Sequence, residues 1–167
     1  MPDFSDLTEE QEKTFRAQAW SYFALHAGQR MQTFQFYVTL ITALVGGAIV
    51  LAKEDFGRIG LEAIGAVITL MSYVFWKLDC RIRTLIKNAE GALKFLDHFH
   101  ALPVVNGAPH PLDMFARDDA LRQRRTGLMK FVSGDLSYSN CFNLVYVTFG
   151  CGGAIFGGAV LLSHWLK

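Results

Sequence analysis

The most regular pattern in the chain is a run without charged residues from Met31 to Ala52, with Arg30 before it and Lys53 after it. A helix needs about 20 apolar residues to cross the hydrocarbon core of a bilayer, and cations commonly mark the ends of such helices. The run therefore predicts a membrane-spanning helix.

The polar and small residues of this predicted span recur on one face. At about 100° per residue they fall within a narrow arc of the helix, away from the large apolar residues. The face consists of Gly28, Gln32, Gln35, Thr39, Thr42 and Gly46. Such groups need partners in protein or water inside a membrane, so the face either packs against another helix or lines an aqueous pore. Under the second interpretation the pore-lining residues are Gln32, Gln35, Thr39, Thr42 and Gly46.

Two further apolar segments are long enough to cross a membrane. The segment from Ile59 to Trp76 contains one charged residue, Glu62, and the segment from Leu136 to Leu166 contains none. The pattern therefore predicts three spans, of which the last is longer than a bilayer requires.

The first two spans are predicted to continue beyond the membrane as helices. Thr8 and Gln11 have the spacing of a capping box, and no proline follows them before the end of the first span. Nothing breaks the second helix before Pro103. We therefore expect two long antiparallel helices, joined at residues 54–57 and projecting well beyond the bilayer.

Outside the membrane, the second helix carries apolar residues that alternate at spacings of four and three. This seam is Leu78, Ile82, Leu85, Ala89, Ala92, Leu96 and Phe99. The first helix offers an answering face made of Phe15, Ala19, Tyr22, Phe23 and His26. The pattern is typical of coiled coils, and it predicts a helical stalk that forms within one subunit or between several.

The predicted fold is an all-α integral membrane protein: a long two-span helical hairpin with a cytoplasmic stalk, plus a third membrane helix at the C-terminal end, assembled as a homo-oligomer. Residues 1–58 form a cytoplasmic helix that continues into the first span, and residues 59–102 form the second span and its cytoplasmic continuation. Residues 103–135 hold a loop and a basic amphipathic helix, and residues 136–167 form the third span.

The net charge is only +1, but most of the 16 lysines and arginines lie before the first span or between the second and third. By the positive-inside rule, the N-terminus and the middle segment are cytoplasmic. Acidic residues precede the first span where a secretory signal would be basic, so that span is expected to stay in the mature, multi-pass protein.

The basic residues of the middle segment form the candidate ligand site. They are Arg81, Arg83, Lys87, Arg117, Arg122, Arg124, Arg125 and Lys130. Three interpretations remain open: topology signals that also contact anionic lipid, a site for the phosphates of a nucleotide or oligonucleotide, and intramolecular pairing with neighbouring acidic residues.

Within the third apolar segment, GCGGAIFGG places Gly153 and Gly157 four residues apart, a pattern that favours close helix association. Glycine is also common throughout membrane helices, which is the plainer explanation. The sequence shows no nucleophile elbow, phosphate-binding loop or metal-ligand spacing. We therefore expect neither an enzyme nor a bound metal or cofactor.

One stretch carries a family resemblance. FWKLDCRIRTLIKNAEGALKFLD, from Phe75 to Asp97, follows a two-span hairpin and places an aromatic residue at the membrane exit, then Leu-Asp-x-Arg, then Ala-Glu. It resembles the SLATT family of bacterial membrane effectors over roughly residues 12–100. The third apolar segment departs from the two-span pattern of that family.

The resemblance implies an effector of antiphage defence, encoded beside a nucleotidyltransferase-like enzyme, that forms a membrane pore under the control of a nucleotide signal. The Hailong-type effectors, which are paired with an enzyme that makes short DNA oligomers, are among the possibilities. By the same resemblance the chain would lie in the inner (cytoplasmic) membrane of a bacterium, and its partners would be lipid, other copies of itself, and the nucleotide or short DNA oligomer.

The sequence thus favours an oligomeric pore or ion channel, gated by a cytoplasmic nucleotide or oligonucleotide, that depolarises the membrane when open. The polar face would supply the conduit, the seam and glycines the assembly, and the basic residues the sensor. The alternative is a non-conducting membrane scaffold that tethers a soluble partner.

Overall fold

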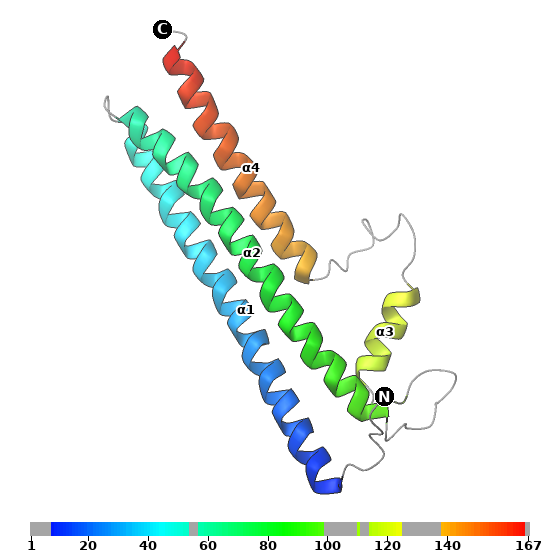
Figure 1. Cartoon of the computed structure of the whole chain (residues 1–167). Coiled ribbons are helices and arrows are strands. Elements are labelled where there is room, and N and C mark those ends of the chain that lie inside the picture. The colour runs from blue at the N-terminus through cyan, green and yellow to red at the C-terminus, as the bar shows by residue number, and fades with distance from the viewer. Residues whose placement is uncertain (1–7, 54–56, 99–109, 111–113, 125–137, 166–167) are drawn as a thin grey trace. The chain divides into compact units, whose positions relative to one another are not determined.

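The computed structural model describes residues 8–53, 57–98, 110, 114–124 and 138–165. These residues form four helices: α1 (Glu9–Leu51), α2 (Gly57–His98), α3 (Met114–Arg124) and α4 (Tyr138–Trp165). Figure 1 shows α1 and α2 as the two long helices. Among the described helices, α1, α2 and α4 are long and apolar enough to cross a membrane, which confirms the prediction of three helices of spanning length.

The start of α1 is fixed by its cap. The Thr8 backbone N–H donates to Gln11 Oε1 at 3.0 Å, and the Gln11 N–H donates to Thr8 Oγ1 at 3.3 Å. This reciprocal pair is the predicted capping box. Acidic residues in the first turn, Glu9, Glu10 and Glu12, also favour the positive end of the helix dipole.

The chain divides into two compact units, each containing part of α1 and part of α2. We call residues Gln29–Arg81 and Leu136–Lys167 the membrane unit, because it holds the most apolar stretches of α1, α2 and α4. We call residues Met1–Gly28 and Ile82–Asp135 the stalk unit.

In the membrane unit, α1, α2 and α4 lie side by side (Figure 1) around a small aromatic core. The core consists of Tyr37, Ile41, Ile68, Phe75, Phe142 and Tyr146. Phe34 of α1 stacks on Phe142 of α4, with ring centroids 3.9 Å apart and planes tilted by 4°. α4 is therefore packed against the helices of its own chain.

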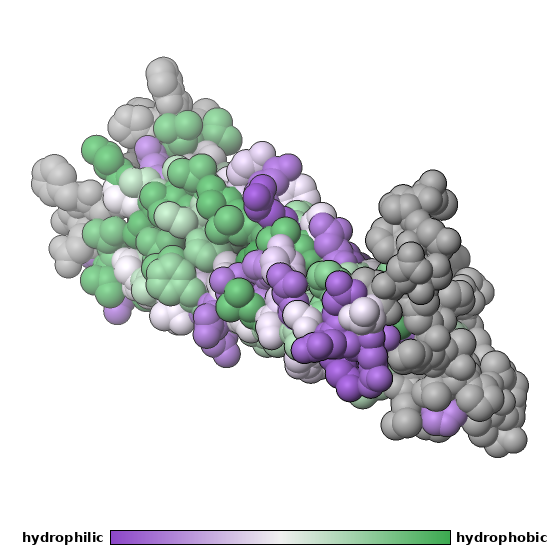
Figure 2. Space-filling model, turned by 60° about the horizontal axis from the view of Figure 1, so that its bottom comes forward, coloured by the Kyte–Doolittle hydropathy of each residue, from purple (hydrophilic) through white to green (hydrophobic). Residues whose placement is uncertain are grey.

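Most of the apolar surface of the membrane unit faces outward. Only 11% of the most apolar stretch of α1 is buried inside the chain, and the same holds for α4. Figure 2 shows the hydrophobic side chains gathered into one broad green area. This is the surface expected of helices whose solvent is lipid.

In the stalk unit, α1 and α2 of the same chain pack against each other. Ala89 and Leu96 of the predicted seam are buried, but Ala92 of the seam is exposed, and Leu93, which was not predicted, is buried in its place. Helix α3 contacts this pair through Phe115, whose ring meets that of Phe23 edge-on at 6.2 Å. Leu78 of the seam is exposed, and Phe99 lies outside the described residues.

Candidate functional site

The polar face of α1 is exposed along its whole length. Gln32, Gln35, Thr39, Thr42 and Gly46 are all exposed in the chain. The buried residues of α1, Tyr37 and Ile41, point to the opposite side at about 100° per residue. Neither α2 nor α4 covers this face, so packing among the described helices does not account for it.

The hydroxyl groups on this face are satisfied locally. Thr39 Oγ1 donates to the Gln35 carbonyl oxygen at 3.0 Å, and Thr42 Oγ1 donates to the Val38 carbonyl oxygen at 2.8 Å. The Gln32 and Gln35 amides make no such bond within the described residues. A Cβ atom placed on Gly46 would meet nothing within 4 Å. The face is therefore open to whatever surrounds the chain.

A buried ion pair joins the three helices of the membrane unit. Arg30 of α1 donates to Asp79 of α2 through Nε–Oδ1 at 2.7 Å and Nη2–Oδ2 at 3.1 Å. The same Nη2 donates to Ser139 Oγ of α4 at 3.2 Å, and the guanidinium carbon lies 4.9 Å from the centre of the Phe142 ring. Asp79 is only 1% exposed. Two-pronged, charge-assisted bonds of this kind fix both distance and orientation.

A second polar contact lies deeper in the same unit. Ser72 Oγ donates to the Ile68 carbonyl oxygen at 2.8 Å, so the Tyr37 hydroxyl is the donor in its 2.8 Å bond to Ser72 Oγ. The Tyr37 ring also meets that of Tyr146 at 4.7 Å. The hydrogen bond lets a tyrosine and a serine be buried in an apolar surrounding.

Neither contact was predicted from the sequence, in which Arg30 marks the end of a span and Asp79 is the acidic residue of the Leu-Asp-x-Arg motif. The available signal was a carboxylate directly after a long apolar segment, because a charge in that position needs a counter-charge.

The glycines of α4 form a close contact with α2 of the same chain. A Cβ atom on Gly65 of α2 would lie 2.9 Å from both the Gly153 carbonyl oxygen and the Gly157 Cα. Thr69 Oγ1 reaches across the contact to the Gly150 carbonyl oxygen at 3.3 Å. The predicted close association is therefore confirmed, with α2 of the same subunit as the partner.

The structure describes the side chains of four of the eight predicted basic residues, so the ligand site that they would form stays a prediction. Arg81 and Arg117 are exposed, and Lys87 pairs with Glu90 at 2.9 Å. Arg83 is half-buried. The side chains of Arg122 and Arg124 in α3 are not described, and Arg125 and Lys130 lie outside the described residues.

Intramolecular pairing accounts for part of the charge in the stalk unit. Lys94 binds Glu90 at 2.8 Å and also Asp119 of α3, and Arg16 of α1 binds Asp97 of α2. Desolvation tends to raise the pKa of Glu90, but the Lys94 and Lys87 ammonium groups outweigh it and hold that pKa below its usual value. Desolvation likewise tends to lower the pKa of Lys94, yet its two carboxylate partners raise it.

These shifts place the network in its charged form at neutral pH. The contribution of Glu90 to stability is present above the ordinary carboxylate pKa and is lost as the pH falls through its lowered pKa. The contribution of Lys94 is present below the ordinary lysine pKa and is lost as the pH rises through its raised pKa.

Replacing Lys94 with methionine is expected to loosen α3. The variant loses the described ion pair to α3, and half-exposed pairs contribute about 0.2–1 kcal/mol, so proteolysis within α3 should accelerate by about 1.5- to 5-fold. Lys87→Met is the matched control, because among the described residues Lys87 pairs only with Glu90, which lies on its own helix. Equal cleavage rates for the two variants would contradict the assignment.

Three apolar helices, joined by a buried ion pair and a glycine contact, place the chain in the class of helical membrane proteins. Comparison with known proteins narrows this class. The chain is 33% identical over 138 residues to CD-NTase-associated protein 19 of Escherichia coli, an alignment that covers 81% of this chain and 83% of that protein. The chain therefore belongs to the family of CD-NTase-associated protein 19.

No family model matches the chain, and no solved structure matches it. The resemblance to the SLATT family accordingly stays a prediction.

Proposed function

We propose that this protein is a membrane effector of antiphage defence that assembles as a homo-oligomer and forms a pore or ion channel. A nucleotide or oligonucleotide, made by a partner nucleotidyltransferase, gates it from the cytoplasm, and the open pore depolarises the membrane. The membrane is the bacterial cytoplasmic membrane, with the N-terminus in the cytoplasm. The role is not enzymatic.

One observation carries the pore. A membrane-length helix presents Gln32, Gln35, Thr39 and Thr42 on a face that the other described helices of its chain leave uncovered. Burying an amide in hydrocarbon without a partner costs several kcal/mol, on the order of 4–8 by transfer to a hydrocarbon solvent. Several copies of α1 arranged around a common axis would give these amides water, and a ring of such faces would make a polar conduit.

Two observations support a nucleotide signal. The relative is named for its association with a CD-NTase, which favours a nucleotidyltransferase partner for this chain as well. In addition, Arg81 and Arg117 are exposed, and neither guanidinium has a described ion-pair partner. Guanidinium groups suit phosphates because they present paired donors.

The pore is tested by removing the polar groups of the face at nearly constant shape. In vesicles that hold the purified full-length protein, the double variant Gln35→Leu/Thr39→Val should lower ion flux through the open state about tenfold or more. A tenfold loss corresponds to about 1.4 kcal/mol on the barrier, and an apolar constriction resists wetting. The readout is the decay of a potassium diffusion potential, followed with a voltage-sensitive dye.

Thr148→Val is the matched control, because Thr148 is also an exposed threonine on a membrane-length helix, α4. It should leave flux unchanged. If instead Thr148→Val lowers flux and the double variant does not, α4 lines the axis. A protein that carries no current in any state would be the non-conducting scaffold.

A further inference from the structure

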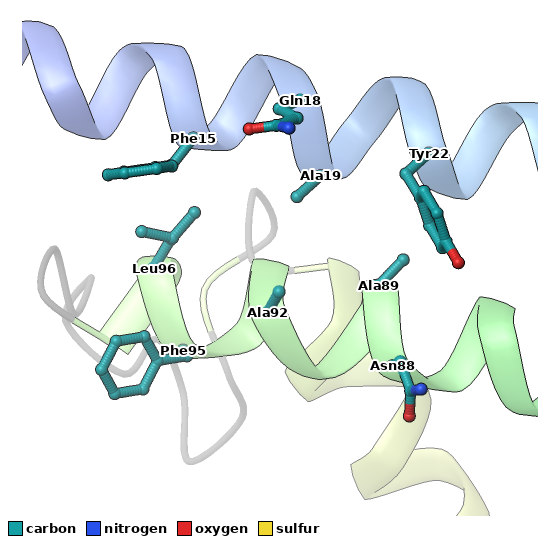
Figure 3. Close-up of a pocket in the computed structure, with 9 residues that line it drawn as sticks. All are labelled: Phe15, Gln18, Ala19, Tyr22, Asn88, Ala89, Ala92, Phe95 and Leu96. Atoms are coloured by element: carbon teal, nitrogen blue, oxygen red, sulfur yellow. The ribbon is translucent and has the colours of Figure 1, made fainter.

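The stalk unit contains an open trough between α1 and α2, with a volume of about 620 Å³. Figure 3 shows Phe15, Ala19 and Tyr22 reaching from α1 toward Ala89, Ala92 and Leu96 of α2. The hollow arises because alanines occupy the middle of the contact, while larger side chains stand at its ends. Its size falls within the range of about 300–1,000 Å³ that is usual for sites of small molecules.

The walls of the trough are aromatic and exposed. Phe15 is 48% exposed, Tyr22 41% and Phe95 49%, although the stalk unit lies outside the charge-free spans. Aromatic side chains in contact with water are costly, and a cluster of them around a hollow marks a binding surface. A flat ring is the ligand shape that such walls accept best, by stacking.

Two amides stand at the rim of the trough, one from each helix. Gln18 of α1 and Asn88 of α2 are both exposed, and neither amide has a hydrogen-bond partner among the described residues. Figure 3 shows Gln18 on α1 and Asn88 at the edge of α2 that lies away from α1. Each amide offers a donor and an acceptor side by side, which matches the paired groups on the edge of a nucleobase.

From these observations we propose that the trough is a nucleobase site: one base of the nucleotide signal stacks against the aromatic walls, while Gln18 and Asn88 bond to its edge. The inference rests on the nucleotide signal of the proposed function and names where that signal is read. Single-stranded nucleic acids are commonly held in this way, by stacking on aromatic residues and hydrogen bonds to exposed base edges.

The chemistry of the lining separates a base from other occupants. None of the 9 lining residues is charged, so the base enters and the phosphates stay outside, near the α2 surface where Lys87 precedes Asn88. A lipid chain would offer neither amide a hydrogen-bond partner. A helix from another copy would fill the hollow too, and the experiment below detects it as a change in subunit number.

The test fills the trough. Full-length protein in lipid nanodiscs is titrated with a short single-stranded oligodeoxynucleotide that carries one fluorescent purine analogue, whose emission falls when it stacks. We expect binding with quenching for the unaltered protein. Ala92→Leu should abolish the quenching and weaken binding about 5- to 100-fold, the loss expected for one stacked base.

Gly91→Leu is the matched control, because Gly91 neighbours Ala92, a Cβ atom there meets nothing within 4 Å, and it does not line the trough. It should bind as the unaltered protein does. Equal binding and quenching by both variants would overturn the site while leaving the nucleotide signal intact. Absence of binding by the unaltered protein, for nucleotides and for DNA and RNA oligomers of every base, would overturn the signal itself. A change of subunit number in Ala92→Leu with unchanged affinity would assign the trough to contacts between copies and overturn the base site.

Discussion

Replacing Asp79 with alanine is expected to lower the free energy of unfolding of the membrane unit by about 3–5 kcal/mol, the usual cost of leaving one member of a buried ion pair alone. Arg30 would keep its positive charge in a site where its side chain is only 13% exposed. The measurement is reversible unfolding of the purified protein in detergent with increasing denaturant.

Two further variants make this expectation specific. The double variant Arg30→Leu/Asp79→Leu should recover most of the loss, because removing both charges leaves no uncompensated ion. Asp97→Ala is the matched control, because it breaks the ion pair with Arg16. The side chains of Arg16 and Asp97 are 38% and 31% exposed, so losing this pair should lower the free energy of unfolding by no more than about 1 kcal/mol. If Asp79→Ala costs as little as Asp97→Ala, the pair does not hold the three helices together.

Replacing Gly65 with valine should separate α4 from α2. Even the first added carbon would lie 2.9 Å from backbone atoms of α4, which cannot rotate away as a side chain can. Overpacking of this kind costs about 1–3 kcal/mol, and a β-branched residue stands at the upper end. The readout is maleimide labelling of Cys141, which is partly buried against the core and should become several-fold faster to label.

Gly158→Val is the matched control on α4, where an added Cβ atom meets nothing within 4 Å. Similar Cys141 labelling in the Gly65 and Gly158 variants would show that the glycine contact does not hold α4 in place.

Much of the fold could be predicted from the sequence, because the signals are local. A charge-free run of sufficient length defines a span, and Thr8 with Gln11 defines a helix start without reference to the rest of the chain. The heptad spacing likewise indicated which side of α2 would be buried near Ala89 and Leu96.

The contacts between helices could not be predicted, because they depend on how distant segments meet. The GCGGAIFGG motif indicated a close partner, but the glycines of α2, which are Gly57, Gly60, Gly65 and Gly91, show no spacing of four residues that would point to Gly65. Arg30 and Asp79 lie 49 positions apart, and each can be explained without the other as a charged residue at the end of a span. The exposure of the polar face could not be predicted either. Helical periodicity shows which residues share a side of the helix, but it does not show what covers that side.

The contact at Gly65 also bears on how this family can change over evolutionary time. Where two backbones touch through glycine hydrogens, the glycines cannot be replaced one at a time. A larger residue at Gly65 or Gly153 is harmful until the opposite helix has shifted. Substitutions at the two positions should therefore occur together or not at all. In an alignment of relatives, this pair would be inherited as one character, whereas Gly152 and Gly158, with open space around them, would vary independently.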